Sequence, residues 1–137
     1  MSQLRWAAAA LGLVLAACAG AAHAPARELQ LAPAGVMVDV EAATVEDHVT
    51  IVDFWATWCA ACHRLDAALR AALVDQPGVV IRRVDIGEPD SEVARAYQIG
   101  ALPHLRLYDR SRRLRYVLVG ADTDDAAALA IELTRTR

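Results

Sequence analysis

TIVDFWATWCAAC, residues 50–62, is a nearly continuous apolar run that ends in two cysteines three positions apart. Ile51 to Trp55 predict a buried strand, and the residues after Cys59 predict a helix. Unpaired N–H groups and the positive end of the helix dipole meet at the start of a helix, so they favour a thiolate at Cys59. Cys62 then lies one turn further on, close enough to close a disulfide. This spacing at a strand-to-helix turn indicates a redox motif.

The pattern along the chain predicts one α/β domain with a central mixed sheet and helices on both of its faces. The expected helices are residues 60–74, a short helix capped by Ser91, and a last helix capped by Asp122. The expected strands are residues 36–40, 50–56, 79–86, 104–108 and 114–119, with an extra edge strand at Glu28 to Leu31. Strand 79–86 runs parallel to strand 50–56 through a right-handed crossover, and the last two strands form an antiparallel hairpin. On the first helix, Asp66 and Arg70 are spaced as an exposed ion pair.

Three segments resemble landmarks of the thioredoxin family. VDFWATWCAAC at 52–62 resembles its strand, its Trp before the first Cys and its dithiol; VARAYQIGALPHLRLYD at 93–109 resembles its proline-containing segment; VLVGADTDD at 117–125 resembles its last strand. The resemblance implies a thioredoxin-like fold over residues 36–137 and thiol–disulfide exchange as the activity. It also implies a cis proline at Pro103, a substrate strand paired with the backbone at Leu102, and a buried acid at Asp53. That acid takes and returns the proton of the resolving cysteine.

The dithiol supplies the chemistry of such a reaction. Cys59 is expected to be the nucleophile and Cys62 the resolving thiol, with no cofactor beyond their own redox-active disulfide. Trp58 is expected to shield the dithiol and to offer an apolar docking rim. No metal site is expected, because a structural zinc site takes four ligands and the chain has no second CxxC pair. A copper-handling protein of the same fold stays open as an alternative, since His104 lies downstream of the dithiol.

The direction of electron flow is predicted from the residues between the cysteines. Ala60 and Ala61 supply no side-chain donor to a thiolate, whereas a His at this place would stabilise the reduced form. We therefore expect a reductant, with a disulfide oxidase or isomerase as the alternative. The expected partners are protein thiols and disulfides and a membrane-bound electron donor or acceptor. A net charge of −3 gives no reason to expect nucleic acid as a partner, and we expect a monomer.

The first residues indicate export. Residues 1–17 are expected to be a signal peptide, because an apolar run follows Arg5 and is too short to span a bilayer. The run ends in Leu15-Ala16-Ala17-Cys18, which resembles a bacterial lipobox and implies a lipid on Cys18. Residues 18–35 then form a flexible tether to the membrane, in the periplasm-facing envelope and with the outer membrane favoured. The alternative is an ordinary signal peptide that is cut after Ala24, which would leave a soluble periplasmic protein.

Overall fold

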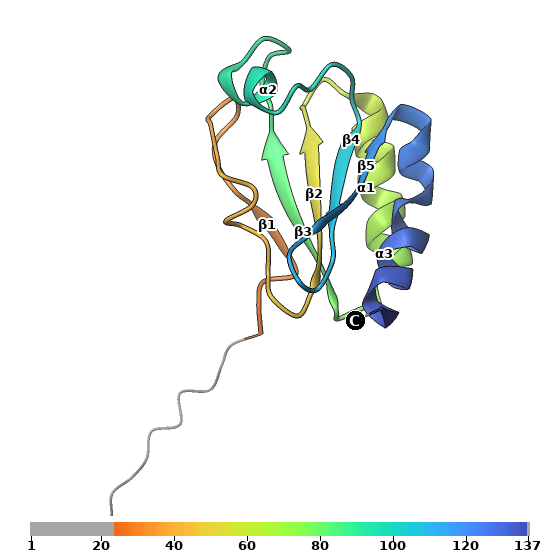
Figure 1. Cartoon of the computed structure of the whole chain (residues 1–137). Coiled ribbons are helices and arrows are strands. Elements are labelled where there is room, and N and C mark those ends of the chain that lie inside the picture. The colour runs from red at the N-terminus through yellow and green to blue at the C-terminus, as the bar shows by residue number, and fades with distance from the viewer. Residues whose placement is uncertain (1–23, 137) are drawn as a thin grey trace, which may run out of the picture.

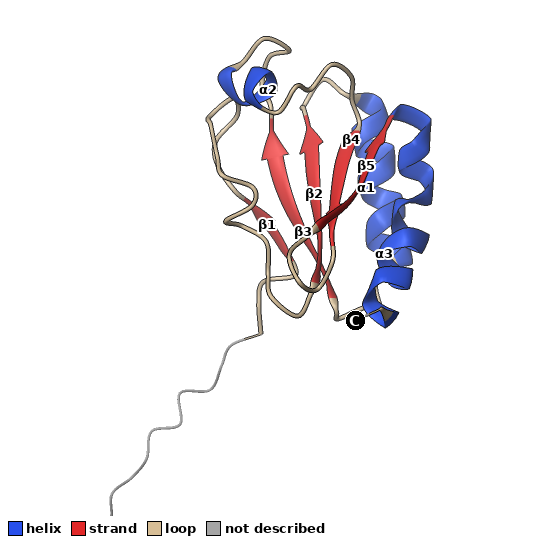
Figure 2. Ribbon diagram, viewed as in Figure 1, coloured by secondary structure: helices blue, strands red, loops and turns tan. Residues whose placement is uncertain are grey.

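The computed structural model describes residues 24–136 as a five-stranded sheet with helices packed against it (Figures 1 and 2). The strands are β1 (Glu28–Gln30), β2 (Val49–Trp55), β3 (Val79–Asp85), β4 (His104–Tyr108) and β5 (Leu114–Val119). The helices are α1 (Ala60–Ala72), α2 (Glu92–Ala96), the 3-10 helix η1 (Gly120–Asp125) and α3 (Ala126–Arg135).

The sheet is mixed, as predicted, and its strand order is β1-β3-β2-β4-β5. β3 is parallel to both β1 and β2, whereas β4 is antiparallel to β2 and to β5. The chain passes from β2 to its parallel neighbour β3 through α1. β2 is buried along almost its whole length, which explains why its sequence is continuously apolar and does not alternate.

A separate core packs on each face of the sheet, because successive strand residues point to opposite sides. Ile51 belongs to the core under α1 and α3, which also contains Leu65, Leu69 and Leu133. Val52 belongs to the core on the other face, to which α2 and the loop before β2 contribute. Figure 1 shows α1 and α3 together on one side of the sheet and α2 away from them. Helices therefore cover both faces, as expected.

The strand expected at residues 36–40 was wrong. The sheet edge beside β3, which such a strand would need, is taken by β1. Val40 is nevertheless fully buried, and its N–H donates to the hydroxyl of Tyr97, which in turn donates to the carbonyl of Val38. A side chain therefore satisfies backbone groups that a neighbouring strand would otherwise pair. The apolar pattern in this segment reflects burial without a strand partner.

The cap expected at Asp122 was also wrong. Asp122 lies inside η1, α3 begins only at Ala126, and neither helix has a side-chain cap bond at its start. The chain enters η1 through Gly120, whose φ of 59° is the left-handed conformation that glycine tolerates best. Ser91 does cap α2 as predicted, because its hydroxyl accepts from the N–H of Ala94 at 3.2 Å.

The folded domain starts before the boundary expected at residue 36. The carbonyl of Arg27 accepts from the N–H of Ile81 at 2.7 Å, and the N–H of Leu31 donates to the carbonyl of Arg83 at 2.9 Å. The predicted edge strand is therefore confirmed, and this part of the expected tether at 18–35 belongs to the sheet. Cys18 and the signal segment 1–17 lie outside the described residues. Within residues 24–136, no helix is both long and apolar enough to cross a membrane.

Candidate active site

Cys59 and Cys62 form a disulfide at the N-terminal end of α1, with their Cα atoms 5.3 Å apart. Cys59 is the N-cap residue of the helix, and its Sγ accepts from the backbone N–H of Cys62 at 3.1 Å. Donors of this first turn have no partner within the helix, so the same contact stabilises negative charge on Cys59 when the disulfide is reduced. Cys59 is 7% exposed and Cys62 only 1%. A partner molecule therefore reaches Cys59 more easily.

Asp53 is buried in β2, on the face of the sheet that α1 covers. The register of β2 against β3 pairs it with Arg83, whose Nε lies 3.4 Å from Asp53 Oδ2. Burial raises the pKa of Asp53 to about 6, although the Arg83 guanidinium acts in the opposite direction. A carboxyl group that titrates in this range can accept and return a proton at physiological pH.

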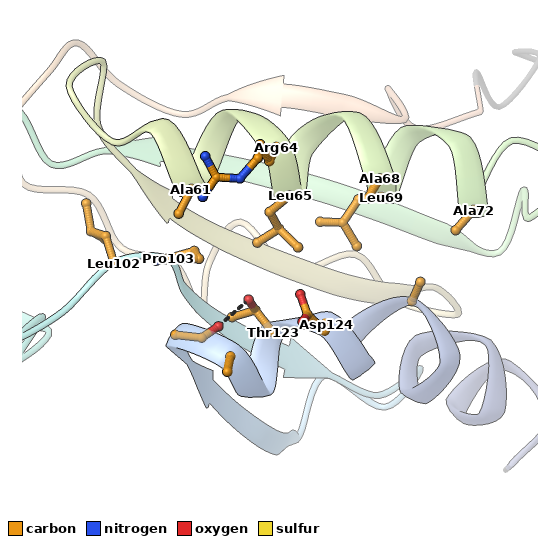
Figure 3. A pocket seen from close by; sticks show the side chains of 13 residues that line it. Ala61, Arg64, Leu65, Ala68, Leu69, Ala72, Leu102, Pro103, Thr123 and Asp124 are labelled. Carbon is orange, nitrogen blue, oxygen red and sulfur yellow. Dashed lines mark hydrogen bonds between the residues drawn. The ribbon is translucent and has the colours of Figure 1, made fainter.

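Pro103 and Leu102 lie beside the dithiol helix. Their peptide bond is cis, as the resemblance implies. Both residues line a groove of about 640 Å³ that runs between α1 and η1 (Figure 3). The groove starts at Ala61, next to Cys62, and continues past Ala68 to Ala72. Small side chains on both walls leave it open, and its lining combines apolar side chains with polar and charged ones.

The two tryptophans near the dithiol occupy different environments. Trp58 is 54% exposed, and its indole N–H donates to the carbonyl of Gly87 at 2.8 Å. Trp55 is half-buried, and its indole N–H donates to Gln30 Oε1 at 3.2 Å. Trp58 thus presents a fixed apolar surface to solvent, whereas Trp55 packs into the structure.

His104 does not join the dithiol. It is buried on the face of the sheet opposite Asp53, where its ring meets Phe54 edge-on with centroids 5.6 Å apart. Across residues 24–136, no cluster of three or more His, Cys, Asp or Glu side chains could hold a metal ion.

Comparison with known proteins agrees with this arrangement, because the thioredoxin family model matches residues 37–132. The chain belongs to the thioredoxin family. Among curated relatives, the thioredoxin of Geodia cydonium is 32% identical over 76 residues, which are 56% of this chain and 71% of that protein. The thioredoxin of Staphylococcus aureus is 35% identical over 65 residues, 47% of this chain and 62% of its own length. This thioredoxin-family chain is a thiol–disulfide oxidoreductase, and its family acts on protein thiols and disulfides.

Solved thioredoxins share the fold of this thioredoxin-family chain. A mutant thioredoxin from Halobacterium salinarum has a TM-score of 0.59 at 23% identity and covers 81% of this chain and 94% of its own. The reduced Schistosoma mansoni thioredoxin pre-protein also has a TM-score of 0.59 at 23% identity, with 79% and 99% covered. At such identity the likeness supports the fold alone.

Sequence reasoning missed part of the surroundings of Asp53 in this thioredoxin-family chain. The pair of Asp66 with Arg70 was predicted, and the two lie 2.9 Å apart. Asp66 also contacts Arg83 NH1 at 3.3 Å, and Glu28 of β1 contacts the same atom at 3.4 Å. The segment of Glu28 was predicted as an edge strand, but only its register against β3 brings this side chain to the site.

Proposed function

We propose that this chain reduces disulfides of exported proteins while a lipid at Cys18 holds it to the membrane of a bacterial envelope. The observation that carries the proposed chemistry is the Cys59–Cys62 disulfide at the start of α1, with Cys59 the more exposed of the two residues. Such a dithiol needs no further cofactor, because it stores and transfers the two electrons itself.

The reaction begins with the reduced dithiol. The Cys59 thiolate attacks one sulfur of a client disulfide, the client S–S bond breaks, and the second client sulfur leaves as a thiolate. Cys62 then loses its proton and attacks Cys59 in the mixed disulfide, which releases the other client sulfur. Two electrons have passed to the client, and the Cys59–Cys62 disulfide remains. A membrane-bound dithiol donor must reduce this disulfide before the next turnover.

Asp53 is the proposed acceptor for the proton of Cys62. It lies on the sheet face that α1 covers, and α1 is the helix that carries Cys62. The raised pKa of Asp53, about 6, leaves a large fraction of the carboxylate ready to take a proton near neutral pH. The proton returns to the departing client thiolate or to water.

The client binds across Trp58 and into the groove beside Pro103. The backbone at Leu102 is the proposed partner for an extended client segment, and the alanines of the groove leave room for its side chains. The proposed monomeric state agrees with this mode of binding, because the groove beside the dithiol must stay accessible to the client.

Two features support reduction as the direction. Ala60 and Ala61 offer no side-chain donor, and within residues 24–136 the Cys62 N–H is the only hydrogen-bond donor to Cys59 Sγ. Fewer contacts to the thiolate stabilise the reduced form less, so the dithiol gives up electrons more readily. The oxidase or isomerase alternative predicts a higher reduction potential.

The location rests on sequence. Leu15-Ala16-Ala17-Cys18 has the pattern of a lipobox, and attachment of more than one acyl chain gives stable membrane anchoring. Ala19 follows Cys18, which favours the outer membrane in a cell that has one. The alternative is a soluble periplasmic protein.

The deciding experiment is equilibration of the purified domain with glutathione buffers, followed by alkylation to count free thiols. A reduction potential below about −230 mV supports a reductant, and a value near −120 mV would show an oxidant. Insulin reduction by Cys59→Ser should fall to background, whereas Cys62→Ser should accumulate a mixed disulfide with the client. Turnover that survives in Cys59→Ser would refute the assignment of the nucleophile.

A further inference from the structure

Four charged side chains from three elements surround the buried Asp53. They are Glu28 from β1, Arg83 from β3, and Asp66 and Arg70 from α1. On the β4 side, Asp53 is paired with the apolar Leu105. The dithiol lies at the start of α1, the helix that carries Asp66 and Arg70.

Arg83 connects Asp53 to the surface carboxylates. Its side chain is only 11% exposed, and its Nε lies 3.4 Å from Asp53 Oδ2 without hydrogen-bond geometry. Its NH1 donates to Glu28 Oε1 at 3.4 Å, the one hydrogen bond that the guanidinium makes within residues 24–136. The guanidinium is therefore directed more toward Glu28 than toward the buried acid, whose Oδ1 has no hydrogen-bond partner in the same part of the chain.

Glu28 is itself held in place from α1. Arg70 donates to both of its carboxylate oxygens, from Nε at 2.9 Å and from NH2 at 2.6 Å. Asp66 reinforces the arrangement, because it contacts Arg70 NH1 at 2.9 Å and Arg83 NH1 at 3.3 Å. A bidentate pair of this kind fixes orientation as well as distance.

β1 also reaches the aromatic residue on which Arg83 stacks. The Arg83 guanidinium lies 4.4 Å from the centroid of the Trp55 ring, and the Trp55 indole N–H donates to Gln30 Oε1. Glu28 and Gln30 are alternate residues of one strand, so they point to the same face. A lysine would lack the planar fork that contacts carboxylates and stacks on an indole together.

We propose that Glu28 is a positioning residue of the dithiol site: it holds Arg83 between itself and Asp53, so that the guanidinium compensates the buried carboxylate only in part. The proposal rests on the proposed role of Asp53 as proton acceptor for Cys62. Arg83 acts here through its charge, because a guanidinium does not lose its proton in proteins. The negative charges of Asp66 and Glu28 raise the pKa of Asp53, and the charges of Arg83 and Arg70 lower it.

The test is the titration of Asp53 in the oxidised protein, followed by NMR of its carboxyl carbon. Glu28→Gln removes one negative charge and frees both arginines, so the pKa of Asp53 should fall by about half to one unit. Arg83→Gln should move the pKa in the opposite direction. Glu28→Asp keeps the negative charge, so the pKa of Asp53 should fall less in this variant than in Glu28→Gln.

Glu132→Gln serves as the matched control, because it removes the same charge from an exposed position on α3 outside this cluster. Its Asp53 titration should be that of the parent protein. An unchanged titration in Glu28→Gln, or an equal shift in both variants, would overturn the proposal.

A second readout separates this proposal from the proposed function. The rate of client release should follow pH with the titration of Asp53 and should shift with it in Glu28→Gln. If Asp53→Asn leaves the rate and its pH profile intact, the proton role of Asp53 is refuted, while the carboxyl titration still reports on Glu28.

Discussion

Asp53 sits where a carboxylate is unfavourable: it is 2% exposed, one of its oxygens has no hydrogen-bond partner in the described part of the chain, and Arg83 is its nearest cation. Burial of an ionised group with such incomplete compensation costs folding free energy. A natural sequence tolerates that cost most readily at a functional site. At the scale of one residue, stability and reactivity therefore point in opposite directions.

Replacing Asp53 by Asn should stabilise the protein at pH 7. The pKa of Asp53 is raised from 3.8 to about 6 in the folded protein. Asp53 therefore contributes fully to the free energy of unfolding below pH 3.8, the pKa of the unfolded state, and this contribution is lost as the pH rises through about 6. We expect the variant to gain roughly 1–3 kcal/mol in free energy of unfolding at neutral pH, after subtraction of the lost contact with Arg83. Urea unfolding at pH 4 and pH 7.5 measures it. An identical pH dependence in both proteins would contradict this account.

His104 should make the fold sensitive to acid. Burial, followed by the charge of Arg106, lowers the pKa of His104, and its Nε2 has no hydrogen-bond partner within residues 24–136. As the pH falls, His104 of the unfolded chain takes up a proton before His104 of the folded chain does. The contribution of His104 to the free energy of unfolding is therefore complete above about pH 6.5 and is lost as the pH falls through the lowered pKa of the folded state. His104→Leu should lose less stability between pH 7.5 and pH 5.5 than the parent, as measured by urea midpoints. Equal losses would show that another group is responsible.

At the scale of elements, small side chains of α1 and η1 leave space for the groove between the two helices (Figure 3). Ala68→Leu should narrow this groove and raise the KM for a protein disulfide about tenfold, which corresponds to ~1.4 kcal/mol. Reduction of a small aromatic disulfide should keep its rate, because that substrate needs only Cys59.

Ala67→Leu is the control for this variant, since Ala67 is an α1 residue outside the groove and leucine is nearly as good a helix former as alanine. Its KM for the protein disulfide should match the parent. Equal KM values for Ala68→Leu and the parent would mean that clients do not use the groove.

The elements also mark where sequence patterns succeed and fail. The helix with Leu65 and Leu69 on one stripe and the buried strand before it follow from local periodicity, which needs no knowledge of distant residues. The alternation at residues 36–40 has the same appearance as a strand, yet Tyr97 completes its backbone hydrogen bonds from 57 residues away in the chain. The periodicity of apolar residues therefore indicates which side chains are buried, but it does not show whether the segment pairs with a neighbouring strand.

At the scale of the whole molecule, the described fold starts near Arg27, whose carbonyl accepts from Ile81, so little chain lies between Cys18 and the sheet. About nine residues span at most about 30 Å when fully extended. A lipid at Cys18 would therefore keep the folded domain near the membrane.

Cys18→Ala should release the chain from the membrane. Expressed from residue 1 in a bacterium, the parent should sediment with membranes and Cys18→Ala should appear in the soluble exported fraction, because the acyl chains supply the membrane affinity. Fractionation followed by immunoblotting measures this, and Cys62→Ser should fractionate like the parent. A parent protein found in the soluble periplasm would favour the cleavage after Ala24.

By itself the sequence determined the dithiol at the start of a helix, the buried acid in the strand before it and the membership of one family, because these signals are local and most lie within a few residues of Cys59. Only the tertiary structure decided that Glu28 meets Arg83, 55 positions away, and that a groove opens beside Pro103. The register of an edge strand and the distance between two helices depend on how all the layers pack together. No short stretch of residues contains that information.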